Sequence, residues 1–121
     1  FAHGARGPQW ARPFQAVAER CRAVRGDDRV ALGFLEFMVP DLVAAGRALV
    51  AQGCTTVEVV PLFLGAGGHV RKDIPVLMAR LQADHPKVQF TLRQAIGEAD
   101  SVVAAMADAA LTGNVVQVPV R

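Results

Sequence analysis

Residues 30–53 read VALGFLEFMVPDLVAAGRALVAQG, and this stretch decides the fold. Its first part, from Val30 to Leu35, is apolar without alternation, as in a strand that is covered on both faces. Pro40 then opens a segment whose apolar residues recur at helical spacing until Gly53, which is placed to cap a helix. A strand covered on both faces predicts helices on both sides of a sheet.

Strand-like and helix-like segments alternate along the rest of the chain. The expected strands are 1–2, 57–64 and 88–92, and the expected helices are 13–24, 73–84 and 100–113. Strict alternation predicts an α/β fold with a parallel four-stranded sheet and right-handed crossovers. Residues 115–121 form a strand-like tail after the last helix, and we expect it to pair with the sheet edge or with another subunit.

Length and composition favour one domain that spans residues 1–121. The chain has 52% hydrophobic and 20% charged residues, and a length of 121 residues suffices for a core without disulfide bonds. The two cysteines, Cys21 and Cys54, are expected to be buried free thiols of a reducing cytoplasm. Because Phe1 lies close to the end of the first expected strand, we expect that strand to be truncated at the N-terminus.

Charge and hydropathy exclude two classes of partner. The 13 Lys and Arg residues are scattered and the net charge is +2, so no basic stripe indicates a nucleic-acid partner. No apolar run approaches the roughly 20 residues that span a bilayer, and no signal peptide is evident, so no membrane association is expected.

Three chemistry-bearing side chains each follow an expected strand. His3, Glu36 and His69 should therefore meet at one rim of the sheet, because ligands bind at the carboxyl ends of parallel strands. Two imidazoles and a carboxylate can bind a divalent metal with open coordination positions, and they can accept protons near neutral pH. Taken singly, each His is more typical of a hydrogen-bonded turn and Glu36 of a cap or ion pair. His85, at the opposite rim, is expected to be structural.

The loop expected at 65–69, with sequence GAGGH, lacks the Lys and hydroxyl of a phosphate-binding loop. Its glycines instead allow the backbone to approach a large flat ligand, or allow the loop to move. Nucleophilic catalysis has no support, because there is no GxSxG turn and neither cysteine is placed near a histidine.

The pattern of motifs resembles the CbiX/SirB family of class II tetrapyrrole chelatases over nearly the whole chain. The resemblance rests on FAHGAR at 1–6, FLE at 34–36 with Pro40, PLFL at 61–64, Gly68-His69 and DIP at 73–75. It implies a three-layer chelatase-like (flavodoxin-like) sandwich and the insertion of Co²⁺, Ni²⁺ or Fe²⁺ into sirohydrochlorin, in cobalamin- or sirohaem-type biosynthesis. The metal is then a substrate, and no organic cofactor is implied.

The resemblance also implies site residues. His3 and His69 would bind the metal and help to remove the pyrrole protons, and Glu36 is the candidate for assisting proton transfer. Arg6 and Arg71, with Lys72 beside it, flank this site and can pair with substrate carboxylates, although solvated surface charge explains them equally well. Gly68 belongs to the substrate-binding block, and chains of this length in the family resemble homodimers.

Two other functions remain open on the sequence. A non-catalytic metal- or tetrapyrrole-binding protein would use the same rim without turnover. An anion- or nucleotide-binding flavodoxin-like module would share the fold, but the missing phosphate motif disfavours it.

Overall fold

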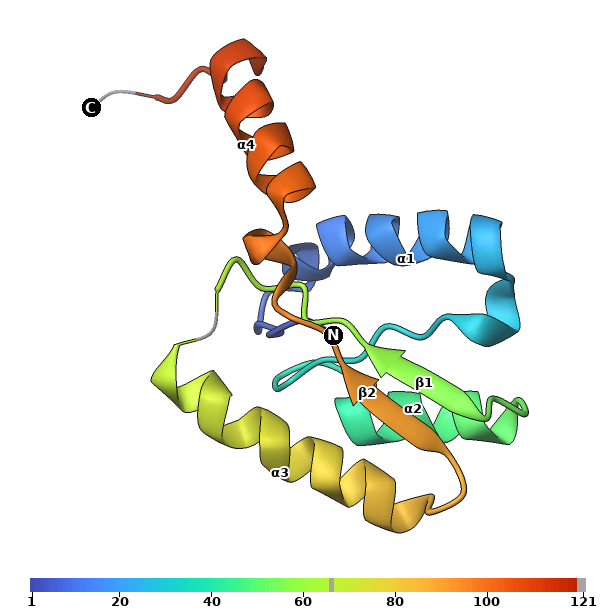
Figure 1. The fold of residues 1–121 in the computed structure, drawn as a ribbon. Helices are drawn as coiled ribbons and strands as arrows, with labels where there is room; N and C mark the ends of the chain where they lie inside the picture. Colours follow the sequence, from blue (N-terminus) through green and yellow to red (C-terminus); the bar gives the residue numbers. More distant parts are fainter. Residues whose placement is uncertain (66, 120–121) are drawn as a thin grey trace.

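The computed structural model describes residues 1–65 and 67–119. Within them lie four α-helices, two regular strands and three short 3-10 helices (Figure 1). The α-helices are α1 (Arg12–Arg25), α2 (Leu42–Ala51), α3 (Gly68–Asp84) and α4 (Asp100–Thr112). The strands are β1 (Thr56–Val59) and β2 (Gln89–Leu92), and the 3-10 helices are η1 (Pro8–Ala11), η2 (Asp27–Arg29) and η3 (Ile96–Glu98). The predicted α/β class is confirmed.

β1 and β2 form a parallel pair, with Thr56 opposite Gln89 and Val59 opposite Leu92. A parallel pair needs a crossover connection, and α3 supplies it. Parallel pairing of these two segments is what the alternation of elements predicted.

Two further segments extend this arrangement without forming regular strands: segment 1–3 contacts the residues just after β1, and segment 33–36 pairs with segment 1–3. An isolated parallel bridge joins Ala2 to Phe34. The segment 1–3 also accepts a hydrogen bond from the N–H of Leu62, just after β1, at 2.7 Å. We expected four regular strands; in the described residues regular pairing is confined to two, because these outer contacts span too few consecutive residues to form a ladder.

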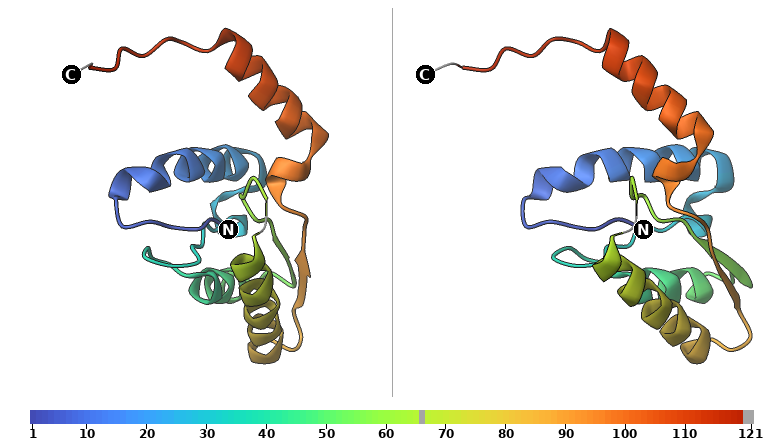
Figure 2. Two further views of the ribbon diagram at one scale, coloured as in Figure 1. Left: turned by 90° about the vertical axis from the view of Figure 1, so that its left-hand side faces the viewer. Right: turned by 60° about the vertical axis from the view of Figure 1, so that its left-hand side comes forward.

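Helices cover the two sides of these strands, with α1 on one side and α2 and α3 on the other (Figures 1 and 2). Phe1 and Ala2 pack on opposite sides of the strands, because the side chains of neighbouring residues in an extended segment face opposite ways. The core on the α2 and α3 side consists of Phe1, Leu42, Val59, Phe63, Val70, Ile74, Leu81 and Ala95. The smaller core under α1 consists of Ala2, Ala11 and Phe34. α2 and α3 approach closely because Gly46 has no side chain; a Cβ there would lie 2.6 Å from Leu81.

The predicted helices α1 and α2 are confirmed, and their ends have local causes. α1 carries a proline in its first turn and ends at Gly26, whose φ of 99° favours glycine. α2 begins after Asp41, whose carboxylate accepts a hydrogen bond from the Ala44 N–H at 2.8 Å. Gly53, predicted as the cap, follows α2 with a φ of 93°.

The prediction for the start of α3 was wrong. We expected a loop through His69 and a helix from Asp73, because Pro75 is typical of a first turn. The helix begins at Gly68 instead, and Pro75 lies inside it. The N–H of Arg71 donates to the Gly67 carbonyl at 3.0 Å, which closes the first helical turn before the proline is reached. His69 is therefore the second helical residue, and Ala66 of the expected loop lies outside the described residues.

The cysteines are free, as predicted, but they are not buried. Cys21 is exposed on the outer side of α1. Cys54 is partly exposed, and its sulfur accepts a hydrogen bond from Arg29 at 3.3 Å. The apolar residues around Cys21 indicated a core face, but part of that face lies outside the packed side of α1.

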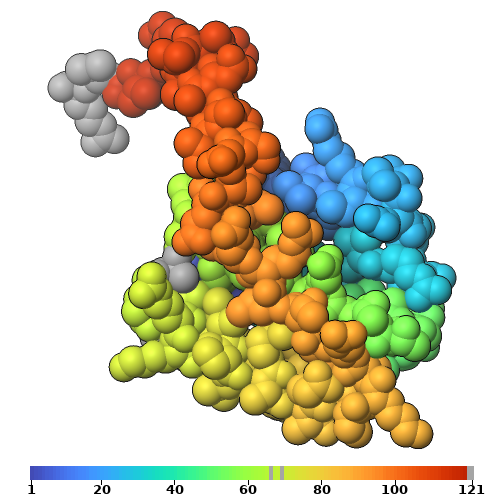
Figure 3. Space-filling model, viewed as in Figure 1, coloured from blue at the N-terminus to red at the C-terminus, as the bar shows by residue number. Residues whose placement is uncertain are grey.

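The chain leaves the body after β2. α4 has no buried residue and projects away from the other elements (Figures 1 and 3). Residues 113–119 have no regular structure, so the strand pairing expected for the tail is not found in its described part, and residues 120–121 lie outside the described residues. No described helix is long and apolar enough to cross a bilayer.

Candidate functional site

His3 lies where segment 1–3 leaves the sheet. The two residues before it are buried, and its ring stacks on the Phe63 ring with 4.1 Å between the centroids and 29° between the planes. Phe63 is itself 2% exposed and lies in the core. A histidine held by its face presents its two ring nitrogens at the edge, so Phe63 fixes the orientation of a potential ligand.

Glu36 lies directly beside His3. The Glu36 N–H donates to the His3 carbonyl at 3.1 Å. Gly4, the residue after His3, has a φ of 84°. A Cβ at this position would collide with the Glu36 carbonyl oxygen. The turn after His3 therefore requires glycine, which lets the two segments approach closely.

The Glu36 carboxylate is exposed. In the part of the chain that the structure describes, no hydrogen bond or ion pair holds it. An ion-paired or capping role, which we kept open for this residue, therefore has no partner there. The arrangement leaves the carboxylate available to a ligand at the rim.

His69 occupies the first turn of α3, and its side chain lies outside what the structure describes. Its neighbour Val70 is buried in the same cluster as Phe1 and Phe63, the ring on which His3 stacks. The first turn of α3 thus packs on the core beside His3. Among the described side chains, which exclude that of His69, no three His, Cys, Asp or Glu groups are close enough to hold a metal. The predicted pairing of the two histidines stays a prediction.

Arg6 makes a contact that the sequence did not reveal. Its guanidinium carbon lies 5.0 Å from the centroid of the Phe37 ring, a cation–π geometry. Phe37 has a φ of 65° and is 59% exposed. A bulky residue in the left-handed region is a strained conformer of the kind that clusters at binding sites. The apolar run at 37–39, next to a rim carboxylate, was the available signal.

The other predicted substrate contacts lie on α3. Gly68 is its first residue, and Arg71 and Lys72 are exposed in its first turns. Cations near a helix N-terminus oppose the helix dipole, which favours anions there. These positive groups and the free N–H groups of the first turn are suited to a carboxylate ligand. His85 lies at the other end of α3, where its ring is tilted against Phe90.

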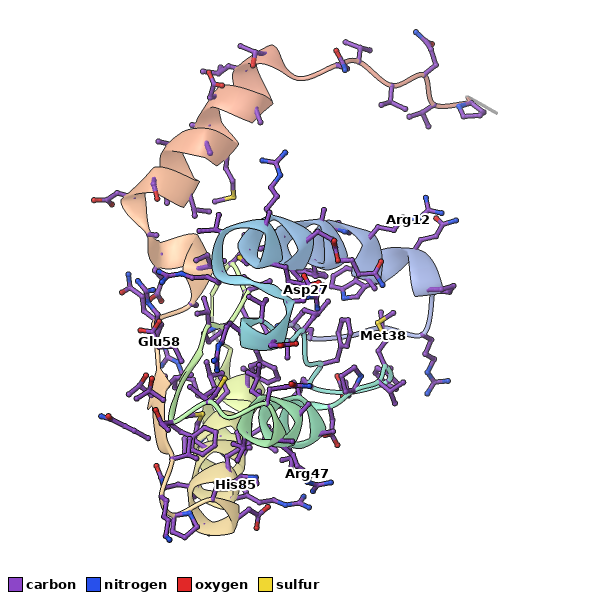
Figure 4. The ribbon with its side chains drawn as sticks, turned by 90° about the vertical axis from the view of Figure 1, so that its right-hand side faces the viewer. Arg12, Asp27, Met38, Arg47, Glu58 and His85 are labelled. Carbon is purple, nitrogen blue, oxygen red and sulfur yellow. The ribbon has the colours of Figure 1, made fainter. Side chains whose placement is uncertain are left out.

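A cleft of about 640 Å³ is lined by residues of α1, of α2 and of the segment 30–34. Figure 4 shows α1 and α2 on either side of that segment. None of its described lining residues is a predicted site residue. Its walls are formed by side chains such as Glu19, Arg22, Phe34 and Pro40, without a histidine or cysteine. We therefore place the site at the rim, where the chemistry-bearing groups are, and not in this cleft.

Segment 1–3 is held against the residues that follow β1. The nitrogen of Phe1 donates to the Val60 carbonyl at 3.0 Å, and the N–H of Leu62 donates to the Phe1 carbonyl at 2.7 Å. These contacts fix the segment from which His3 projects.

A family model described as CbiX matches residues 1–112. The chain belongs to the CbiX family. The sirohydrochlorin ferrochelatase of Bacillus subtilis (strain 168) is 32% identical over 86% of this chain. The sirohydrochlorin cobaltochelatase of Saccharolobus islandicus (strain L.S.2.15 / Lassen #1) is 36% identical over 73% of this chain. This CbiX-family chain spans 40% of the length of the first relative and 66% of the second.

Solved structures show the same fold. A CbiX protein from Marinobacter aquaeolei VT8 is 34% identical, with a TM-score of 0.78 over 91% of this chain and 89% of that chain. The sirohydrochlorin chelatase SirB from Bacillus subtilis subspecies spizizenii, in complex with cobalt, is 30% identical, with a TM-score of 0.78. The match covers 91% of this chain and 47% of that SirB chain. The resemblance seen in the motifs is confirmed at the level of the family and its fold.

Proposed function

We propose that this CbiX-family chain inserts a divalent metal into sirohydrochlorin or a related tetrapyrrole, in cobalamin- or sirohaem-type biosynthesis. The observation that carries the proposal is the placement of His3, stacked on Phe63 at 4.1 Å and next to Glu36 at the rim. Membership of a family whose relatives are named sirohydrochlorin chelatases supports it. Co²⁺, Ni²⁺ and Fe²⁺ are the candidate metals, since nitrogen and oxygen donors suit all three.

The reaction needs groups that bind a metal weakly and accept protons. Two pyrrole N–H protons leave the macrocycle as the metal enters, so the charge of the metal is exchanged for two protons. In this proposal His3 and His69 hold the incoming metal in place of water, and the imidazole nitrogens that give up the metal then accept the protons. Glu36 passes protons to solvent. Imidazole and carboxylate release a metal more readily than thiolates do, which suits transfer.

The macrocycle would be bound by its rim carboxylates and its flat face. We assign the carboxylates to Arg6 and to Arg71, beside the backbone of Gly68. The exposed Phe37 ring, with Arg6 over it, offers an apolar surface next to a cation. Exposure of a large apolar side chain in a strained conformation has a physical reason if a flat ligand covers it.

The same proposal includes the finer architecture and setting. Residues 1–121 act as one chelatase domain, a three-layer sandwich in which segments 1–3 and 33–36 complete a four-stranded parallel sheet. The protein works in the cytoplasm, in keeping with its free cysteines. Two copies form a homodimer, because a single small domain offers only one wall for a large macrocycle.

The first prediction concerns the rate of metal insertion into metal-free sirohydrochlorin, measured by absorbance for each metal in turn. We expect the His3→Ala and His69→Ala variants to lose at least about 100-fold in kcat/KM, since each removes a ligand and a proton acceptor. Arg6→Ala should raise KM for the tetrapyrrole and leave cobalt binding, measured by calorimetry, unchanged.

Full insertion rates in both histidine variants would overturn the site assignment. Saturable binding of sirohydrochlorin and cobalt without insertion by the unmodified chain would identify a non-catalytic binding protein instead. His85→Ala is the matched control, because this third histidine lies at the far end of α3 and should retain the rate.

A further inference from the structure

α4 carries an apolar face that nothing in the described structure covers. Val103, Met106 and Leu111 are 50%, 41% and 87% exposed. At 100° per residue these positions, with Ala107 and Ala110 between them, share one side of the helix. The space-filling view shows α4 standing away from the body of the molecule (Figure 3). A helix of this kind is expected to be covered by a partner surface.

The start of α4 is held against the body of the molecule through η3. The N–H groups of Ile96 and Gly97 in η3 donate to carbonyls after β1, at 2.9 Å each. Gly97 lies so close to the backbone of Leu64 that a Cβ there would collide with it. α4 follows within two residues of η3, and the N–H of Val103 donates to the Ala99 carbonyl at 3.0 Å. These contacts hold the start of α4 beside the segment that follows β1, while Val103, Met106 and Leu111 stay exposed.

The outer side of α1 offers a surface that matches this face. Val17, Cys21 and Val24 form an apolar stripe at helical spacing, and Val17 and Val24 are 44% and 81% exposed. They line a shallow groove of about 340 Å³, flanked by Arg20 and Arg25. The stripe lies next to the packed face of α1. Cys21 therefore has apolar neighbours on the helix although its side chain is exposed.

The two helices are complementary in length and charge. α1 has 14 residues and α4 has 13, so each is roughly 20 Å long. α1 carries four arginines and one glutamate, whereas α4 carries Asp100 and Asp108 and no basic residue. A basic helix with an apolar stripe and an acidic helix with an apolar face attract each other and exclude like pairing.

We propose that two copies of this chain exchange their α4 helices, each α4 covering the Val17–Cys21–Val24 stripe of the other copy. The contact is made twice around a two-fold axis, as in an isologous dimer. α4 departs after β2 from the carboxyl end of the sheet, the end at which His3 lies, so the second copy stands near the rim. This inference rests on the proposed function only in that both include a homodimer. The experiments below do not measure metal insertion, so their failure is distinguishable from a failure of the proposed activity.

Cross-linking tests which surfaces meet. In the full chain carrying Cys54→Ser, Met106→Cys places a thiol on the apolar face of α4, opposite the native Cys21. A short bis-maleimide should then yield a species of twice the chain mass, and peptide mass spectrometry should link residue 106 to Cys21. Ala105→Cys, on the opposite side of α4, is the matched control and should give little of this product. Cys21→Ser should abolish it.

Three results of this experiment would overturn the proposal. A link between residue 106 and Cys21 within one chain would show that α4 folds back. Equal yields from Met106→Cys and Ala105→Cys would show that the face is not specific. A product that persists with Cys21→Ser would place α4 elsewhere.

Sedimentation velocity at micromolar concentration gives an independent measurement. The unmodified chain should sediment as a dimer. Met106→Glu should raise the dimer dissociation constant by at least about tenfold, because it buries a charge in the apolar contact, whereas Ala105→Glu should not. A monomeric unmodified chain, or an equal effect of both substitutions, contradicts helix exchange. Circular dichroism of both variants checks that each is folded. If Met106→Glu does not fold, the cross-linking experiment with Met106→Cys and Ala105→Cys still tests the proposal.

Discussion

At the scale of single residues, Gly4 determines how the rim is built. Its φ of 84° and its contact with the Glu36 carbonyl bring the turn after His3 against the segment that carries the carboxylate. Any side chain at this position would push the two segments apart. The proximity of His3 and Glu36 therefore depends on a residue that has no chemistry of its own.

Gly4→Ala is expected to lower the free energy of unfolding by about 2 kcal/mol, because it combines a positive φ with a steric collision. Gly7→Ala is the matched control, since a Cβ there would meet nothing within 4 Å. Urea denaturation of both variants provides the measurement, and the Gly7 variant should stay within about 0.5 kcal/mol of the parent. Equal stability of the two variants would show that the close approach is not needed.

At the scale of elements, segment 1–3 shows how a piece of chain can position a site without forming a regular strand. Its first residue contacts Val60 and Leu62 after β1, and its second forms a parallel bridge with Phe34. The placement of His3 therefore depends on the pairing of the two residues before it.

The elements also show what periodicity can and cannot predict. It located α1, α2 and α4, because an apolar stripe at helical spacing is a local property of the sequence. It misplaced the start of α3, because Pro75 is compatible with a first turn as well as with a helix interior that forgoes one hydrogen bond. It also identified the apolar faces of α1 and α4 without indicating what covers them, so the exposure of Cys21 could not be predicted.

For the candidate site, the sequence predicted where the backbone brings residues together but not the contacts of their side chains. The rule for parallel sheets brought His3 and Glu36 to one rim, and the structure places their backbones within hydrogen-bonding distance. Their chemical roles stay predictions. The stack of His3 on Phe63 and the contact of Arg6 with Phe37 depend on side-chain conformations, which no spacing rule specifies.

At the scale of the whole molecule, the protein has one packed body and one projecting arm (Figure 2). The body places the rim residues, and α4 leaves it near that rim. If exchange of α4 brings a second copy to this end, a tetrapyrrole held between the copies would contact both. Ligand binding and dimer formation must then be coupled, and the coupling is reciprocal.

Saturating metal-free sirohydrochlorin is accordingly expected to lower the dimer dissociation constant by about tenfold. Sedimentation velocity of a fluorescently labelled chain, with and without the tetrapyrrole, measures this change. Arg6→Ala, which weakens tetrapyrrole binding in our proposal, should reduce the shift. An unchanged dissociation constant at saturation would mean that the ligand contacts one copy alone.

The stacking of His3 on Phe63 links the packing of the core to the candidate site. Phe63 belongs both to the hydrophobic interior and to the support of the His3 ring, which we propose binds the metal, so a change in packing there should also change the reactivity that we propose. Directed evolution for heat resistance that repacks this position would alter metal transfer at the same time. If His3 binds the metal as proposed, selection for a more stable interior and selection for chemistry act on the same residue.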